Sequence, residues 1–135
     1  MTADEKRAIA LKLVNSLGRN GGFDDSLVTD DFSWWGYGVG TLNTEGLKGL
    51  VTALKPIMPT PPTLTIVGTA VEGDRVAVEA DGDCVLSNGR RYQNKYHWVV
   101  LFRDGRVCVL KEFYDSKYAY ETIGAAALDT LPRNP

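Results

Sequence analysis

Two short turn signals in the second half of the chain constrain its fold more than any other feature. Asn88-Gly89 and Asp104-Gly105 each separate segments in which apolar and polar residues alternate. Such a pair between alternating segments is the strongest short-range signal for a two-residue β-hairpin. The sequence therefore predicts consecutive antiparallel strands over residues 63–71, 75–86, 91–102 and 106–114, with Gly73-Asp74 as the first turn.

The first half of the chain has the periodicity of helices instead. Apolar residues recur three and four positions apart over residues 4–17 and 44–55. Helices placed before hairpin-linked strands indicate an α+β fold, with a curved antiparallel sheet wrapped by three helices. Long twisted strands curl, so we expect a cone-shaped barrel with a deep pocket. The remaining expected elements are a short helix over 24–30, an aromatic strand over 32–37 and a last helix from about 115 to 127.

Length and charge restrict the function classes. The 135 residues suffice for one domain, so we expect a single domain over 1–135 with a loose tail at 127–135. A formal charge of −2 provides no excess of positive charge to attract the phosphates of a nucleic acid, which argues against nucleic acid as a partner. No apolar run is long enough to cross a membrane, and the charged first residues do not resemble a signal peptide. We therefore expect a cytoplasmic protein with no membrane partner.

Cysteine and histidine are scarce in this sequence. Cys84 and Cys108 cannot make a disulfide framework, and with His97 as the only histidine no zinc signature can be written. No cofactor or metal is therefore expected. Any catalysis must rest on carboxylates, tyrosine and asparagine.

The first hairpin predicts which side chains share a face of the sheet. A two-residue turn at Asn88-Gly89 pairs Ser87 with Arg90, and residues opposite each other lie on one face. Large rings with a few converging polar groups are typical of a ligand pocket, where a carboxylate tends to have a raised pKa. Asp81 fits the pocket best because its expected partner is Tyr96, whereas Glu79 and Asp83 fit a solvated part of the face equally well. On this register the face holds Glu79, Asp81, Asp83, Tyr92, Asn94, Tyr96, Trp98 and Val100.

The second hairpin allows two registers. Strict pairing across Asp104-Gly105 places Glu112 beside His97, on the face away from the pocket. One β-bulge near Cys108 instead places Glu112 beside Tyr96 and Leu110 beside Trp98. Spacing alone leaves both registers open.

The opposite face of the predicted sheet has an apolar stripe. Val76, Val78, Val99 and Leu101 would face water if helices cover only one side of the sheet. An exposed patch of this kind usually marks a partner surface. We therefore expect a homodimer that pairs through the outer face of the sheet.

Five segments of the sequence together have the pattern of a known family: Asp30–Gly36, Gly73–Asp83, Asn88–Trp98, Phe102–Val107 and Lys111–Asp115. They resemble the SnoaL-like proteins of the nuclear transport factor 2-like superfamily, which also includes ketosteroid isomerase and limonene epoxide hydrolase. The resemblance covers roughly residues 4–120 and implies a curved sheet wrapped by three helices around a deep, mostly apolar pocket.

The resemblance also implies roles for individual residues. Val107, Leu110 and Glu112 fit the SnoaL-like pattern of two apolar residues followed by an acid on the last strand, which favours the bulged register. The epoxide hydrolase uses a relay of two acids and an arginine. The resemblance matches Asp81 and Glu112 to the two acids and places Glu79 at the position of the arginine. Ketosteroid isomerase combines a carboxylate base with a tyrosine and a protonated aspartic acid, which Tyr96 could imitate with Asp81 or Glu112.

Two function classes follow from the sequence. In the first, an enzyme without a cofactor transfers a proton on a small apolar carbonyl or polycyclic compound, as an isomerase or cyclase. Asp81 or Glu112 would be the base, and Tyr96 and Asn94 would hold a developing oxyanion. In the second, the same pocket is a non-catalytic binding module; an epoxide hydrolase-like enzyme is a further alternative. The expected ligand-binding residues are Trp34, Glu79, Asp83, Trp98, Val100 and Leu110.

Overall fold

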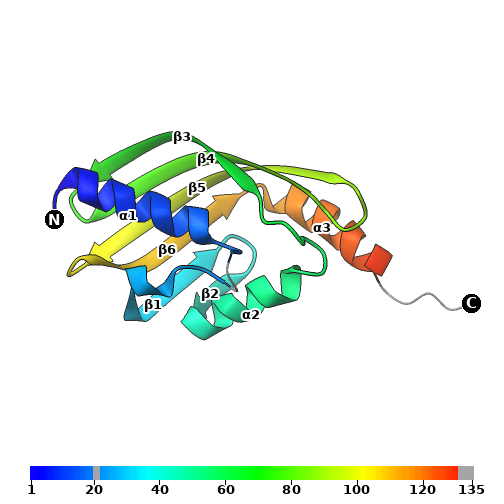
Figure 1. The fold of residues 1–135 in the computed structure, drawn as a ribbon, viewed down its shortest axis with the longest axis horizontal. Helices are drawn as coiled ribbons and strands as arrows, with labels where there is room; N and C mark the ends of the chain where they lie inside the picture. Colours follow the sequence, from blue (N-terminus) through cyan, green and yellow to red (C-terminus); the bar gives the residue numbers. More distant parts are fainter. Residues whose placement is uncertain (20–21, 131–135) are drawn as a thin grey trace, which may run out of the picture.

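The computed structural model describes residues 1–19 and 22–130. Six strands form one curved sheet that stays open at both edges (Figure 1). Their order across the sheet is β2-β1-β6-β5-β4-β3, so the hairpin-linked strands make up most of it. The strands are β1 (Val28–Gly36), β2 (Gly40–Asn43), β3 (Thr63–Glu72), β4 (Arg75–Val85), β5 (Arg91–Arg103) and β6 (Arg106–Tyr114).

Three helices accompany the sheet, which confirms the expected α+β class. They are α1 (Ala3–Ser16), α2 (Thr44–Leu54) and α3 (Ser116–Thr130). The short helix expected over 24–30 is only the 3-10 turn η1 (Asp25–Leu27), because Val28 already begins β1. Helix α3 runs through the first four residues of the expected tail, and residues 131–135 lie outside the described residues.

Strand β1 is the main departure from the expected topology. It runs parallel to β6, with Trp34 beside Leu110 and Gly36 beside Glu112, while the other pairs are antiparallel. The sheet is therefore curved as expected, but it is mixed instead of purely antiparallel and it is not closed. Hairpin signals inform only about strands that follow each other along the chain, so they carry no information about the partner of β1.

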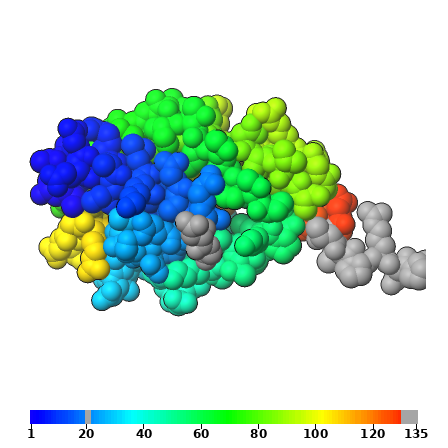
Figure 2. Space-filling model, in the orientation of Figure 1, coloured from blue at the N-terminus to red at the C-terminus, as the bar shows by residue number. Residues whose placement is uncertain are grey.

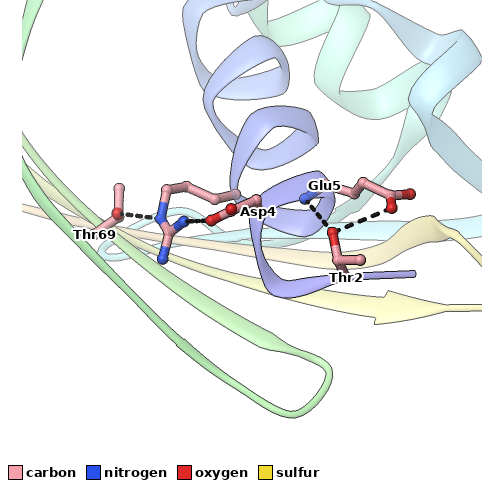
Figure 3. A network of polar contacts seen from close by, with 5 residues as sticks. Thr2, Asp4, Glu5 and Thr69 are labelled. Atoms are coloured by element: carbon pink, nitrogen blue, oxygen red, sulfur yellow. Dashed lines mark hydrogen bonds and ion pairs between the residues drawn. The ribbon is translucent and has the colours of Figure 1, made fainter.

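Helix α1 is fixed at its start by a small polar network (Figure 3). The Thr2 hydroxyl accepts a hydrogen bond from the Glu5 backbone N–H at 3.1 Å and donates one to the Glu5 carboxylate. Arg7 pairs with Asp4 and donates to the Thr69 hydroxyl of β3 at 3.0 Å. The cap satisfies a free N–H of the first helical turn, and the Arg7 contact attaches the helix to the edge of the sheet.

The apolar core lies between α1 and one end of the sheet. Ala10, Leu13 and Val14 of α1 pack on Val76 and Val78, which lie on the concave face. A second cluster lies at the other end, where Ala119 and Ala126 of α3 pack against Cys84, Leu86 and Tyr92. Core side chains thus cover the concave face under α1. At the other end of the sheet, α3 packs beside the hairpin that joins β4 and β5.

The register of β4 against β5 differs from the expected one by a single residue. The Gly89 N–H donates to Leu86 O at 2.9 Å, Leu86 pairs with Arg90 through a 2.8 Å bond, and Gly89 has φ +83°. These features define a three-residue loop that ends in a left-handed glycine, a common alternative to the two-residue turn. A shift of one residue moves every side chain of a strand to the other face. Consequently Glu79, Asp81 and Asp83 pair with His97, Lys95 and Gln93 on the outer face.

The second hairpin contains the bulge that the sequence left open. Arg103 pairs with Arg106 as expected, and the register then shifts between Leu101 and Phe102. The extra residue lies in β6, which carries Glu112 opposite Trp98 rather than Tyr96. Leu110 accordingly pairs with Val100 and not with Trp98. The prediction of a bulge is correct and the direction of its shift is wrong, but both shifts leave Glu112 on the concave face.

The outer face of the sheet is less apolar than expected. Val76 and Val78 are fully buried on the concave face, so only Val99 and Leu101 of the predicted stripe lie outside. Trp35 and Phe113 join them there, with ring centroids 5.1 Å apart. Over the part of the chain that the structure describes, no helix is both long and apolar enough to cross a membrane.

Candidate functional site

A large cavity opens between the concave face and the ends of the three helices. Its volume is about 1150 Å³, above the usual size of a pocket for a drug-sized ligand. Its walls are the end of α1, most of α2, the connector Pro59–Pro62 and α3 as far as Ala127. Figure 2 shows the surface hollowed between the blue end of α1 and the green segment that follows α2. The floor is polar and aromatic, and consists of Trp34, Tyr92, Tyr96, Trp98, Glu112 and Tyr114.

Two of the floor rings lie over glycines. A Cβ atom on Gly36 would come within 2.0 Å of the Trp34 ring, and one on Gly82 within 2.6 Å of the Tyr96 ring. Tyr96 also stacks on Trp98, with centroids 5.1 Å apart and planes at 7°. Glycine at these two positions is therefore required by the position of the neighbouring ring, which fixes the shape of the floor. Periodicity in the sequence contains no signal for such a contact.

Glu112 is the only acid among the described residues that line the cavity. Trp98 Nε1 donates a 2.9 Å hydrogen bond to Glu112 Oε1. Burial raises the pKa of the Glu112 carboxyl from 4.5 to about 7, and the indole N–H groups of Trp98 and Trp34 oppose this rise. Because this pKa lies near neutral pH, both the protonated and the ionised form of Glu112 would be populated there, as a group that accepts and donates protons requires.

The indole of Trp34 has a free donor. The residue is 3% exposed, and its Nε1 is the one buried side-chain nitrogen or oxygen without a hydrogen-bond partner in the described part of the chain. A buried N–H without a partner costs about 1–3 kcal/mol. Trp34 lies close enough to lower the pKa of Glu112, but its N–H does not meet the geometry of a hydrogen bond to that carboxyl.

The tyrosines of the floor are weak acids. Burial raises the pKa of Tyr96, with further contributions from Tyr92 and Glu112. Burial also raises the pKa of Tyr114 to about 12 and raises that of Tyr92. All three phenols therefore stay protonated near neutral pH and are not bases; each hydroxyl can donate a hydrogen bond, and that of Tyr92 also accepts one from Asn94.

Comparison with known proteins shows which family this sequence belongs to. The sequence model for the SnoaL-like domain matches residues 22–110, well over half of the chain. The chain belongs to the SnoaL-like domain family. The matched segment ends two residues before Glu112. A search of curated proteins finds no match.

Solved structures support the same fold for this SnoaL-like chain. The pinacolase BvnE from Penicillium brevicompactum is 17% identical, with TM-score 0.78 and coverage of 96% of this chain and 98% of that one. A protein assigned as a SnoaL-like polyketide cyclase from Jannaschia is 18% identical, with TM-score 0.76 and coverage of 91% and 94%. TerC co-crystallised with polyporic acid is 21% identical, with TM-score 0.64 and coverage of 74% and 82%. At these identities the likeness concerns the fold alone.

The acids of β4 do not reach the pocket of this SnoaL-like domain. Asp81 accepts a 2.9 Å bond from Lys95, and Asp83 forms a bidentate pair with Arg91 that lowers the pKa of the Asp83 carboxyl. Glu79 is exposed on the same outer face. The expected placement of all three in the pocket is therefore wrong, because the three-residue hairpin loop turns their side chains outward.

Asn94 lies beneath the pocket but does not line it. Its Nδ2 donates to the Tyr92 hydroxyl at 2.8 Å and to Asp115 O at 3.1 Å. Its Oδ1 accepts the backbone N–H groups of Lys95 and Asp115. Both donors and both acceptor sites of the amide are in use, so Asn94 joins β5 to the start of α3 and has no free donor for an oxyanion.

Val100 and Leu110 belong to the core and not to the cavity. Both are fully buried, pair with each other across β5 and β6, and do not line the cavity. The expectation that they lie in the pocket is therefore wrong. The structure brings Trp34, Tyr96, Trp98 and Glu112 together in the pocket. Sequence reasoning missed the wall that α3 supplies and the phenol of Tyr114.

In the residues described, no group of three or more His, Cys, Asp or Glu side chains could hold a metal ion.

Proposed function

We propose that this SnoaL-like protein binds a small apolar carbonyl or polycyclic compound and transfers a proton on it, without a cofactor, as an isomerase or cyclase would. The observation that carries the proposal is the position of Glu112, a partly buried acid on the floor of a large, mostly apolar cavity, where burial raises the pKa of its carboxyl to about 7. A general base works best when its pKa lies near the working pH.

The proposed step is a proton transfer to and from carbon. The Glu112 carboxylate takes a proton from a carbon next to a carbonyl group. The electrons of that C–H bond form a carbon–carbon double bond, and the carbonyl becomes an enolate. The Glu112 carboxylic acid then returns the proton to carbon, which restores the carboxylate. Tyr96, which stays protonated, supplies a donor on the floor of the same cavity.

The shape of the site supports an apolar ligand of two or more rings. The rings of Trp34, Tyr96, Trp98 and Tyr114 offer flat surfaces around Glu112. The related TerC was crystallised with polyporic acid, a small organic ligand, in the same fold. The rings around Glu112 support a flat ligand with a polar contact at the floor, and the TerC complex supports a small organic ligand in this fold.

The epoxide hydrolase-like alternative finds no support in this arrangement. That mechanism needs two acids and an arginine around one water, whereas Glu79 and Asp81 lie on the outer face. The non-catalytic binding module differs from the proposal only in what Glu112 does. A carboxyl paired with a cation would favour simple binding, but Glu112 has an indole N–H as its partner.

Deuterium exchange into a bound ketone tests the proposal. In D₂O at pD 7.5, the protein should accelerate the exchange of the protons beside the carbonyl of 1-tetralone, followed by proton NMR. Glu112→Gln should lower this rate by about 100-fold or more, because general acid–base catalysis supplies 10²–10⁴-fold. Asp81→Asn is the matched control and should leave the rate unchanged. Exchange no faster than in buffer, or an equal rate in Glu112→Gln, would contradict the proposal; binding without exchange would favour the binding module.

We further propose that two copies of the chain pair through the outer face of the sheet. Val99, Leu101, Trp35 and Phe113 give this face an apolar centre, and Phe113 is 38% exposed. Val99→Asp should lower the sedimentation coefficient from that of a dimer to that of a monomer. Ser87→Asp, in the exposed hairpin loop, is the control and should sediment as the unmodified protein does. An unchanged coefficient in Val99→Asp would refute the interface.

A further inference from the structure

The charged residues of the cavity are separated by depth. Glu112 lies on the floor and is the only acid among the described residues that line the cavity. Three cations line the same cavity, and all three are exposed: Arg19, Lys55 and Lys117. A residue that both lines a cavity and is exposed lies where the cavity opens to solvent. The mouth is therefore cationic, although the chain as a whole has a formal charge of −2.

None of the three cations at the mouth has an acidic partner. Seven other Lys or Arg side chains form ion pairs, whereas Arg19, Lys55 and Lys117 form none with any described residue. An exposed lysine needs no partner, so one cation at the mouth would show little. Here three separate segments each place a cation at one opening, and like charges repel each other. A ligand with a negative charge would relieve this repulsion.

Arg19 is the cation whose position is best defined. Its Nε donates to Asn15 O at 3.0 Å and its Nη2 donates to Pro62 O at 3.2 Å. Asn15 and Pro62 also line the cavity, and the hollow in Figure 2 lies beside the end of α1. A guanidinium has five N–H donors, of which these two bonds use two. The remaining donors suit the two oxygens of a carboxylate.

The walls that α2 and α3 supply are mainly apolar. They include Leu50, Val51 and Leu54 of α2 and Ile123 and Ala127 of α3. The cavity thus combines an acid on its floor, apolar walls and a cationic mouth. A neutral ring compound would match the floor and the walls but would leave the charge of the mouth without a partner.

We propose that the substrate is an acid, a ring compound whose carboxylate stays at the mouth and binds Arg19 while its rings lie against the apolar walls. Lys55 and Lys117 add to the attraction. This inference rests on the proposed function, in which Glu112 acts on the other end of the same ligand. A carboxylate beside ionised Glu112 would be repelled, so the ligand enters with its carbonyl end first. The contact at the mouth then orients that end toward Glu112.

Salt dependence in the unmodified protein gives the first test. The probe 1-pyrenebutyrate has a carboxylate on a short chain, and 1-pyrenebutanol has a neutral hydroxyl in its place. Binding of each is measured by pyrene fluorescence at pH 7.5. From 20 to 500 mM NaCl the affinity for 1-pyrenebutyrate should fall about 5-fold, because salt screens exposed charges, and that for 1-pyrenebutanol should change less than about twofold. An equal response of the two compounds would overturn the inference.

Two double variants locate the charge. Lys55→Gln/Lys117→Gln should weaken 1-pyrenebutyrate binding at 20 mM NaCl by about 3- to 10-fold. The matched control Arg75→Gln/Arg106→Gln removes the same charge from exposed side chains that do not line the cavity. It should change this affinity by less than about twofold, and neither double variant should change 1-pyrenebutanol binding. Equal losses in the two double variants would show that only the net charge matters, and would overturn the inference.

Arg19 is tested by a conservative and a neutral substitution. Arg19→Lys keeps the charge and loses the fork of donors, so it should weaken 1-pyrenebutyrate binding by about 3-fold, whereas Arg19→Gln should weaken it by about 10-fold. Binding of 1-pyrenebutanol should stay unchanged in both. An equal loss of the two compounds in Arg19→Gln would mean that Arg19 only holds the wall through Pro62, and would overturn its role in binding.

The outcomes separate this inference from the proposed function. If 1-pyrenebutyrate binding depends on the cations of the mouth but the protein does not accelerate exchange into 1-tetralone, the acid-binding mouth stands and the proton transfer fails. If exchange depends on Glu112 but the two pyrene compounds respond alike to salt and to the variants, the proton transfer stands and the acid-binding mouth fails.

Discussion

The two faces of the sheet hold carboxylates in opposite environments. On the outer face, Asp81 and Asp83 lie in solvent beside Lys95 and Arg91, and the Arg91 contact lowers the pKa of Asp83. On the concave face, Glu112 is desolvated, has an indole as its partner, and has a pKa of about 7. The pKa of a carboxyl is thus lowered at Asp83 on the outer face and raised at Glu112 on the concave face. The surroundings on each face, more than the residue type, set the pKa.

The largest effect should be on the pH dependence of proton transfer. If the Glu112 carboxylate is the base, the rate of exchange into 1-tetralone should rise with pH and level off above about 7. At pH 5 the rate should be roughly 100-fold below the plateau, because only about one protein in a hundred has Glu112 ionised two units below its pKa. A rate profile from pH 5 to 9 checks this. A rate that is already constant at pH 5 would show that the base is not a carboxyl with a raised pKa.

The next effect concerns stability, because here a substitution should raise the free energy of unfolding, whereas most substitutions lower it. The pKa of Glu112 is higher in the folded protein, about 7, than the ordinary value of 4.5. As pH rises between these values the unfolded chain loses its proton first, so the free energy of unfolding falls and is then constant above pH 7. Glu112→Gln should therefore stabilise the fold at pH 8 by about 3 kcal/mol, or roughly 10 °C in Tm.

The control for this prediction is the same variant in acid. At pH 4 the native carboxyl is already neutral, so Glu112→Gln should leave the Tm nearly unchanged. Calorimetry at the two pH values makes the comparison. Equal effects at pH 4 and pH 8 would show that the carboxyl is not desolvated in the folded state.

A smaller effect tests the glycine that lies under the Trp34 ring. The Cβ atom of Gly36→Ala would meet that ring at 2.0 Å, so the ring must move. Overpacking of this kind costs about 1–3 kcal/mol, measured by urea denaturation. Gly49→Ala in α2, where nothing lies within 4 Å of the new methyl group, should instead be neutral or slightly stabilising. A Gly36→Ala variant as stable as the parent would show that the floor is not fixed by this contact.

The smallest effect belongs to the outer face. Asp81 and Lys95 are both exposed, and exposed ion pairs contribute little to stability. Asp81→Asn should change the Tm by less than about 1 °C at any pH between 5 and 8. A loss of stability comparable to that of Gly36→Ala would show that the Asp81 carboxylate on the outer face is not the weakly coupled, solvent-exposed group described above.

The sequence predicted where the strands lie better than how they pair. Alternation and turn residues located β3 to β6 to within a residue or two, because both signals are local. The face of Asp81 depended on whether Asn88-Gly89 turns in two residues or three, and both loops suit this dipeptide. The face of Glu112 was predicted correctly, because the expected and the observed bulged registers differ by two residues and a shift of two keeps a side chain on the same face.

Other parts of the site depend on contacts between distant segments. The parallel pairing of β1 with β6 brings Trp34 beside Glu112, and no local signal in the sequence specifies that pairing. The hydrogen bonds of Asn94 involve α3, whose position the sequence left open. A polar residue on the correct strand face can thus be structural or functional, and only its partners distinguish the two.

Titration of the carboxyl groups by carbon-detected NMR tests the central claim most directly. The account predicts that the Glu112 side-chain carbonyl titrates with a pKa of about 7, while Asp83 on the outer face titrates below its ordinary value. A pKa near 4.5 for Glu112 would mean that water reaches the carboxyl, and would contradict its role as the proton carrier of the pocket.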